Sequence, residues 1–324
     1  MRKLYIVMYH YTRDLVNSRY PEIKGLDYQL FKQQIDYFAE NFHVVTMEQV
    51  IEAVNSKDGG RSLPENAMLL TFDDGYIDNF VAAFPVLKVH GMQGSFFIPG
   101  KTIAENVLLD VNKIHFVLAS ADIQLLVKDV LGWMDYYRGG KYSYAPNNVL
   151  WEKYAIANRF DCKETVFVKR MLQTVLPEAL RNQLGSELFT KYVGLPEDKF
   201  ARELYMNYDQ IRLMKQDGMF IGFHGYDHYW LANLTEEEMH RDIDRGLDAI
   251  DEFIDRDAWV INYPYGNNNL AVTDYARSKG CKLGLTTEVR VAQIGGDNKF
   301  LLPRFDCNDF PPKSENYKMV EASL

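Results

Sequence analysis

Short apolar runs alternate with amphipathic helical patterns along most of this chain, and this alternation constrains the fold more than any other feature. The runs have the length of β-strands and occupy residues 4–9, 68–72, 95–98, 220–223, 259–263 and 283–286. Between several of them apolar residues recur at helical spacing, as at Phe31, Ile35 and Phe38. Thr235 and Glu238 form a capping-box signature at the start of another helix. The pattern predicts an α/β fold with a mainly parallel sheet or barrel and helices outside it.

Residues 104–200 interrupt this alternation. Their apolar residues form helical stripes that contain Ile123, Val127, Val130, Leu131 and Met134, then Val168, Met171, Leu172 and Val175, and then Leu180, Leu184, Leu188 and Tyr192. We therefore expect a large helical insertion at 104–200 in an α/β domain formed by residues 1–103 and 201–324. The apolar stripes suit two roles, closure over a small substrate or self-association into a homo-oligomer.

Composition and charge exclude several classes of partner. The 324 residues carry a net charge of −9 and show no basic stripe, which argues against binding to nucleic acid. No stretch approaches the roughly 20 apolar residues of a membrane span, and the run at 4–9 is too short for a signal peptide. Cys162, Cys281 and Cys307 lie far apart, as in proteins of reducing compartments. These features predict a soluble cytoplasmic protein.

Polar clusters follow three of the expected strands directly. They occupy residues 71–76, 224–228 and 262–266. Parallel α/β folds place their active sites at the carboxyl ends of their strands, so we expect these clusters to meet.

The first two clusters together contain the residue types of a hydrolytic metal site. His224 and His228, four residues apart, can converge on one ion, and a carboxylate completes a two-histidine, one-carboxylate face with open positions. Asp73 and Asp74 can point different ways, so one can bind the ion while the other takes a proton from water that the ion activates. Each motif alone is weak, and the simpler alternative is two solvated turns rich in Asp and His.

These clusters resemble the motifs of one known family. Residues 71–75, Thr-Phe-Asp-Asp-Gly, look like the first motif of the polysaccharide deacetylases, the NodB-homology group or carbohydrate esterase family 4. His224 and His228 match the histidines of the second motif, and residues 263–266, Tyr-Pro-Tyr-Gly, are similar to the third. Residues 8–11 resemble the start of the branch that acts on poly-N-acetylglucosamine. The similarity covers residues 1–100 and 205–310 and leaves the insertion unmatched.

The resemblance implies a distorted (β/α) barrel with fewer strands than the full eight. It also implies a divalent ion held by Asp74, His224 and His228, with zinc expected first and nickel, cobalt or manganese as alternatives. Asp73 would then be the general base. The backbone N–H of Tyr265 would help to hold the tetrahedral oxyanion.

This sequence departs from the family pattern at two supporting positions. Gly225 stands where the second motif usually has Ser or Thr after its first histidine. Asn262 occupies the region in which the third motif usually carries an arginine that orients the base. Arg304 is our candidate replacement for that arginine, and an ordinary surface ion pair is the alternative interpretation.

The general acid is the most consequential departure. Many family members use a histidine near the end of the chain to protonate the leaving amine, but no histidine follows His240 here. His10 stands at the end of the first expected strand, where the resembling branch also places its acid, and we assign it that role. The alternative is a buried, hydrogen-bonded structural histidine. His115, in the insertion, is a remote candidate.

The sequence therefore predicts a metal-dependent enzyme that removes acetyl from an N-acetylated sugar or oligosaccharide precursor in surface glycan biosynthesis. One alternative is a catalytically silent carbohydrate-binding protein on the same fold, although a free carboxylate beside the metal argues against it. Another keeps the hydrolase and changes the substrate to an O-acetyl ester or a non-sugar amide.

Overall fold

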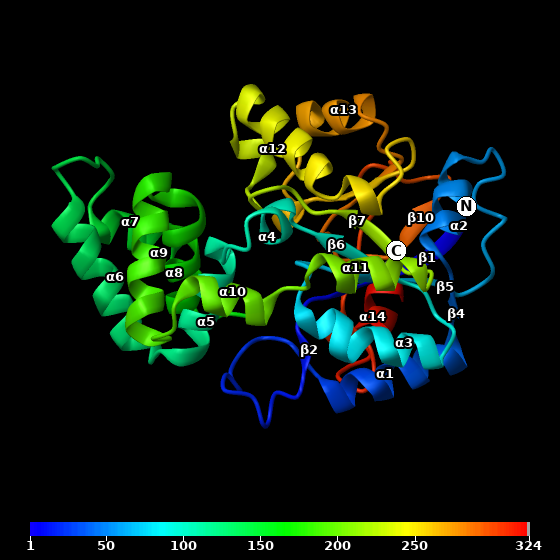
Figure 1. The fold of residues 1–324 in the computed structure, drawn as a ribbon, viewed down its shortest axis with the longest axis horizontal. Coiled ribbons are helices and arrows are strands. Elements are labelled where there is room, and N and C mark those ends of the chain that lie inside the picture. Colours follow the sequence, from blue (N-terminus) through cyan, green and yellow to red (C-terminus); the bar gives the residue numbers. More distant parts are fainter. Residues whose placement is uncertain (323–324) are drawn as a thin grey trace. The chain divides into compact units, whose positions relative to one another are not determined.

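The chain forms two compact units in the computed structural model, which describes residues 1–322 (Figure 1). One unit comprises residues 1–16, 25–106 and the chain from 201 onward, and the other comprises residues 17–24 and 107–200. The boundaries at 103 and 201 expected from the sequence leave residues 17–24 in the barrel, whereas the contacts of the described chain group them with the helices. These residues join the helical unit because Tyr20 packs edge-on against Phe116, with ring centroids 4.9 Å apart, and Lys24 pairs with Asp161.

A curled mixed sheet of nine strands organises the first unit. Its strands follow the order β10-β1-β5-β6-β7-β8-β9, with β11 paired to β1 and β4 paired to β5. The strands are β1 (Arg2–Tyr9), β4 (His43–Val44), β5 (Ala67–Phe72), β6 (Gly94–Ile98), β7 (Phe220–Phe223), β8 (Val260–Asn262), β9 (Leu283–Leu285), β10 (Ala292–Ile294) and β11 (Phe305–Asp306). Among the strands of residues 1–322 in this sheet, only β10 runs antiparallel to its neighbour. The expected distorted α/β barrel is confirmed. A separate pair joins β2 (Thr12–Arg13) to β3 (Leu26–Asp27).

A short segment near the carboxyl end spans the two sides of the curled sheet. Leu302 forms a parallel bridge with Leu285 of β9, and three residues later Phe305 of β11 pairs with Val7 of β1. Residues 302–306 therefore link β9 to β1, and they carry Arg304 to the inside of the unit.

The side chains of the central strands alternate between two buried clusters, as period-two strands require. In β1, Tyr5, Val7 and Tyr9 belong to the cluster that the helices cover, whereas Leu4 and Ile6 belong to the cluster on the opposite face. The alternation fixes the register of each strand, because a slip by one residue would exchange the two faces. The carboxyl ends of the strands are thereby held in fixed positions.

Helices of the first unit cover one face of the sheet, and the amphipathic patterns expected from the sequence are confirmed there. These helices are α1 (Tyr28–Asn41), α2 (Met47–Asn55), α3 (Phe84–Val89), α4 (Gly100–Ala104), α11 (Tyr208–Gln216), α12 (Glu236–Ala249), α13 (Leu270–Ser278) and α14 (Asn316–Ala322). Among them α2 differs, because Met47, Val50 and Ala53 join the cluster of the opposite face. Capping boxes open α2 at Thr46 and α12 at Thr235.

Helices make up most of the longer segment of the second unit. Its helices are α5 (Asp110–Ser120), α6 (Ile123–Tyr137), α7 (Asn147–Tyr154), α8 (Lys163–Arg170), the π-helical turn Met171–Val175 and α9 (Glu178–Tyr192), and α10 (Glu197–Leu204) crosses the boundary between the units. Lys113 is buried between the carboxylates of Asp110 and Glu197. Within residues 1–322, no helix has both the length and the apolar character that crossing a membrane requires.

Candidate metal centre

Three of four adjacent parallel strands deliver the candidate residues to one edge of the sheet. Asp73 and Asp74 follow β5, His224 follows β7, and Asn262 is the last residue of β8. β6 lies between β5 and β7. Because all of these strands run parallel, their carboxyl ends meet at the same edge, and the polar clusters that follow them come together there.

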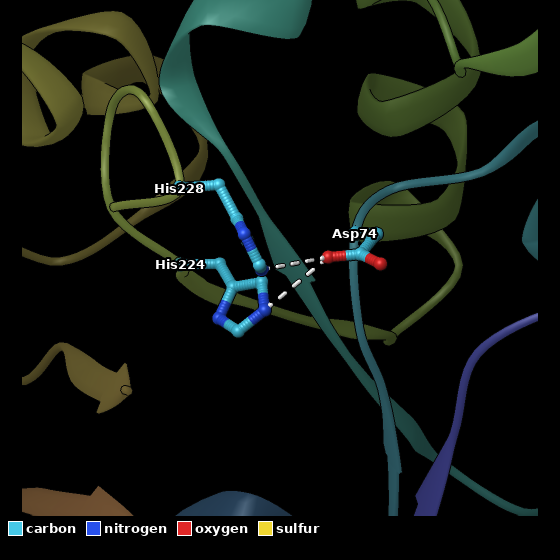
Figure 2. Close-up of side chains that lie close together, drawn as sticks. All are labelled: Asp74, His224 and His228. Carbon is cyan, nitrogen blue, oxygen red and sulfur yellow. Dashed lines mark ion pairs between the residues drawn. The ribbon is translucent and has the colours of Figure 1, made fainter. Parts of the chain in front are cut away.

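Asp74, His224 and His228, here called the metal triad, each offer one ligand atom to a shared point (Figure 2). These atoms all lie within 4.8 Å of one another. Asp74 Oδ1 lies 3.4 Å from His224 Nε2 and 3.2 Å from His228 Nε2. All of these side chains are buried.

The chemistry of the metal triad fits a divalent cation. Asp74 Oδ1 is buried, and within residues 1–322 it accepts no hydrogen bond. Such an orphaned buried acceptor is unfavourable unless a cation or another donor satisfies it. Burial opposes the charge of Asp74, but His228 and His224 lower the pKa of its carboxyl well below the usual range. Burial lowers the pKa of His228, which favours the neutral form that binds metals.

Hydrogen bonds orient two members of the metal triad from behind. His224 Nδ1 lies 2.7 Å from the backbone oxygen of Asn262, which can only accept, so Nδ1 carries a proton. In the neutral form of this ring Nε2 keeps the lone pair that a metal ligand needs. The hydroxyl of Tyr76 donates to Asp74 Oδ2 over 2.5 Å and leaves Oδ1 facing the histidines. Such second contacts fix the tautomer and direction of metal ligands.

Asp73, Asn262 and Arg304, here called the base cluster, form a second buried network beside the metal triad. Arg304 is fully buried and donates from Nη1 and Nη2 to the two carboxylate oxygens of Asp73, each over 2.9 Å. Asn262 Nδ2 donates to Asp73 Oδ1 over 2.6 Å. Burial opposes the charge of Asp73, yet Arg304, His224 and His10 lower its pKa to about 2. Asp73 is therefore held as a carboxylate.

Hydrogen bonds to two separate strand regions hold Arg304, one just after β9 and one in β5. Its Nε donates to the backbone oxygen of Thr286 over 2.9 Å, and its Nη1 also donates to the hydroxyl of Thr71 over 3.0 Å. The alternative interpretation of Arg304 as a surface ion pair is wrong, because the 302–306 segment carries it into the interior.

His10 lies beside the base cluster at the end of β1. Its Nε2 is 3.8 Å from Asp73 Oδ2, and its side chain is 36% exposed. The alternative of a buried structural histidine is therefore wrong. Being partly exposed, His10 can reach a bound molecule.

Tyr265 forms part of an aromatic wall beside the metal triad. Its ring lies 4.8 Å from that of His228, edge to face, and stacks on Trp230 with centroids 4.6 Å apart. Asp74, His228 and Tyr265 all have positive φ. The other non-glycine residues with positive φ within residues 1–322 are asparagines, which tolerate it better. Backbone strain is thus concentrated at this site, as is common for functional centres.

Sequence reasoning missed two contributors to the site. Asn262 was noted only as the residue that stands in place of an arginine, although it bonds both Asp73 and His224. Tyr76 is the last residue of the first polar cluster, and the sequence pattern assigned it no role. Its position two residues after Asp74 was the available signal. His115 lies on α5 in the helical unit.

Comparison with known proteins decides the family. The family model described as polysaccharide deacetylase matches residues 60–129 and 142–284, more than half of the chain. The chain belongs to the polysaccharide deacetylase family. Among curated proteins, a putative polysaccharide deacetylase of Bacillus subtilis, YxkH, is 33% identical over 101 residues, a match that covers 31% of this chain and 33% of that protein.

Solved structures share the fold of this family member over nearly its whole length. The deacetylase PplD of Streptococcus pyogenes, determined in complex with acetate, is 18% identical, with a TM-score of 0.58 over 98% of this chain and 96% of that one. IcaB of Ammonifex degensii is 19% identical, with a TM-score of 0.56 over 100% of this chain and 98% of that one. A de-N-acetylase of Aggregatibacter actinomycetemcomitans is 17% identical, with a TM-score of 0.55 over 94% of each chain. At these identities the likeness establishes the fold alone.

Proposed function

We propose that this family member is a metal-dependent de-N-acetylase that removes acetyl from an N-acetylated sugar or oligosaccharide. The observation that supports it is the pair of adjacent carboxylates. Asp74 leaves an unsatisfied oxygen toward two imidazoles, whereas Asp73 is kept ionised by Arg304 within reach of the same point. Hydrolysis of an amide needs both functions, a cation site and a base, side by side.

In this proposal the metal triad holds the ion, and zinc is the first candidate. A divalent ion bound there lowers the pKa of water and polarises the acetyl carbonyl. The oxygen of the attacking water bonds to the carbonyl carbon, and Asp73 accepts the proton that this water loses. Oδ2 is the atom suited to this step, because Asn262 and Arg304 both donate to Oδ1, whereas Oδ2 accepts from Arg304 and faces His10.

The remaining proton transfer falls to His10. When the bond between the carbonyl carbon and the nitrogen breaks, His10 donates a proton to the departing amine, and acetate is the other product. The backbone N–H of Tyr265 supports the negative oxygen of the tetrahedral stage. The strained backbone at Tyr265 is consistent with an N–H that is held in place for this task.

The substrate carrier and the cellular location belong to the same proposal. We infer a nucleotide-linked, lipid-linked or free oligosaccharide precursor of a surface glycan, processed in the cytoplasm. Three cysteines without disulfides support a reducing compartment. Self-association through the helical unit stays a prediction.

Acetate release with defined substrates tests the proposal. Purified protein loaded with zinc is given UDP-linked N-acetyl sugars, N-acetylglucosamine oligomers and matched O-acetyl esters, each with and without a chelator. We expect release from an N-acetyl sugar that the chelator abolishes and added zinc restores. Faster release from the esters would favour the O-acetyl esterase. Sugar binding without release from any substrate would favour the silent binding protein.

A further inference from the structure

The turn between the two histidine ligands is held unequally at its two ends. His224 has the backbone oxygen of Asn262 behind its ring. His228 has no such support, because its Nδ1 is buried and within residues 1–322 makes no hydrogen bond. His228 also has a φ of 57°. The direction of its Nε2 therefore depends on the backbone of the turn and on the packing of its ring.

One buried carboxylate accepts hydrogen bonds from two backbone N–H groups of this turn. Asp242, on α12, accepts from the backbone N–H of Tyr226 at Oδ1 over 2.9 Å and from that of Asp227 at Oδ2 over 3.0 Å. Asp242 is buried, with only 5% of its surface exposed. Tyr226 and Asp227 lie between the two ligands, so a single side chain spans the centre of the turn.

The close approach of Gly225 shows how tightly the turn and the carboxylate fit. Gly225 has a φ of 76°, and a Cβ there would lie 3.3 Å from Asp242 Oδ1. A side chain at this position would be strained by the backbone and would press on the carboxylate. Glycine allows Asp242 to approach.

The carbonyl groups of the same turn are bonded elsewhere, by main chain. The N–H of Gly100 donates to the oxygen of Gly225 over 2.9 Å, and that of Lys101 donates to the oxygen of Tyr226 over 3.1 Å. Mutation of side chains leaves these bonds available. Side chains hold Tyr226 and Asp227 as well, because the Tyr226 hydroxyl bonds to Glu105 and Arg245, and Asp227 pairs with Lys101. Asp242 is the side chain that accepts from the backbone N–H groups of the turn, and it can be removed alone.

Burying the carboxylate of Asp242 costs free energy that helix packing alone does not require. Burial raises the pKa of Asp242 to about 6, and the N–H groups of Asp227 and Tyr226 oppose that rise. An apolar residue would pack on α12 without this penalty, but it would leave the buried N–H of Tyr226 and the partly buried N–H of Asp227 without their acceptor. The hydrogen bonds to the turn therefore explain why a carboxylate is buried at position 242.

We propose that Asp242 is a positioning residue of the metal centre, whose carboxylate holds the 225–228 turn so that His228 Nε2 points at the ion. This inference rests on the proposed metal site and is independent of the sugar substrate. Asp242 contacts neither ion nor substrate in this role. Its effect therefore appears in metal affinity and ligand geometry.

Metal binding by full-length variants tests this role. Zinc dissociation constants are measured by competition with a chromophoric chelator, and the visible spectrum of the cobalt-loaded protein reports the ligand field. We expect Asp242→Ala to weaken zinc binding about 10- to 100-fold, the range found for partners that orient ligands. The cobalt spectrum should change as well. Asp242→Asn, which keeps one acceptor and the volume, should lie between Asp242→Ala and wild type.

The matched control is Asp248→Asn on the same helix. Asp248 is exposed and pairs with Arg256 over 2.7 Å, so its loss should leave zinc affinity and the cobalt spectrum unchanged. If Asp242→Ala does not fold, Asp242→Asn carries the test. Wild-type affinity and spectrum in the folded Asp242 variants, or an equal loss in Asp248→Asn, would overturn the positioning role alone. Wild-type protein that binds no divalent ion would overturn the metal site too.

Discussion

The metal triad and the base cluster each contain a buried carboxylate, but the charge of the two carboxylates is compensated differently. Both aspartates are 2% exposed and adjacent in sequence. Asp73 has its charge balanced within the chain by a bidentate arginine. Asp74 keeps Oδ1 without a hydrogen bond in the described chain and faces two imidazoles. A buried carboxylate oxygen without a hydrogen bond is unfavourable, so a cation at the metal triad would stabilise Asp74.

The contrast predicts that substitutions on the two sides fail differently. Loss of a member of the metal triad should remove the ion. Changes in the base cluster should leave the ion bound and alter proton transfer. Measuring metal content and turnover on the same samples separates these outcomes.

Asp74→Asn should have the largest effect. An amide cannot supply the negative ligand, so we expect most of the zinc to be lost and acetate release to fall about 1,000-fold or more, in line with several kcal/mol of transition-state stabilisation by a metal. Metal content is measured by mass spectrometry after gel filtration. A full complement of zinc in a folded Asp74→Asn protein would show that the ion binds elsewhere.

Asp73→Asn is the paired test from the base cluster. It keeps the shape of the side chain but removes the base, so we expect bound zinc near the wild-type level and turnover lower by about 100- to 10,000-fold. Turnover is followed as acetate release and metal content on the same preparation. Full activity would exclude Asp73 as the base, and loss of zinc would make it a ligand.

His10→Gln should reduce turnover by about 100-fold while zinc stays bound. An amine needs a proton to depart, whereas a phenolate departs without one. The loss should therefore be much smaller with 4-nitrophenyl acetate than with an N-acetyl sugar. His43→Gln, at an exposed histidine bonded to the backbone oxygen of Glu65, is the control. Equal losses with both substrates would exclude His10 as the acid.

The sequence predicted the parts of this site that follow from local pattern. Apolar runs of strand length located β1, β5 and β7, and the polar residues after them supplied both aspartates and both histidines. In parallel sheets such positions share one edge, so their meeting could be expected from chain order alone. Adjacent aspartates also indicated two different tasks.

Contacts that depend on long-range closure could not be predicted in the same way. Arg304 reaches Asp73 only because residues 302–306 link β9 to β1, and β11 is two residues long with no strand pattern. Asp242 is one polar position on the amphipathic helix α12. Its partners are backbone N–H groups, which carry no sequence signal. Tyr20 joined the helical unit through ring contacts that composition does not reveal.

Arg304→Lys should have the smallest effect on maximal turnover and the clearest effect on its pH dependence. Lysine keeps a positive charge but cannot bond both oxygens of Asp73 as the guanidinium does. With less stabilisation of the carboxylate, the pKa of Asp73 rises from about 2. The base acts when deprotonated, so a higher pKa moves the acid limb of kcat/KM to higher pH. At neutral pH Asp73 stays ionised, so the loss of about tenfold that we expect there, equivalent to about 1.4 kcal/mol, comes from less exact placement of its carboxylate.

The control for this variant is Arg290→Lys. Arg290 pairs with Glu288 and Asp297, so its replacement should leave the acid limb in place. Zinc content should be unchanged in both variants, because neither arginine belongs to the metal triad. An acid limb that does not move in Arg304→Lys would mean that the ionisation controlling activity is not that of Asp73. The balance between Arg304 and Asp73 would then serve stability alone, and the base would have to be sought at another group facing the metal triad.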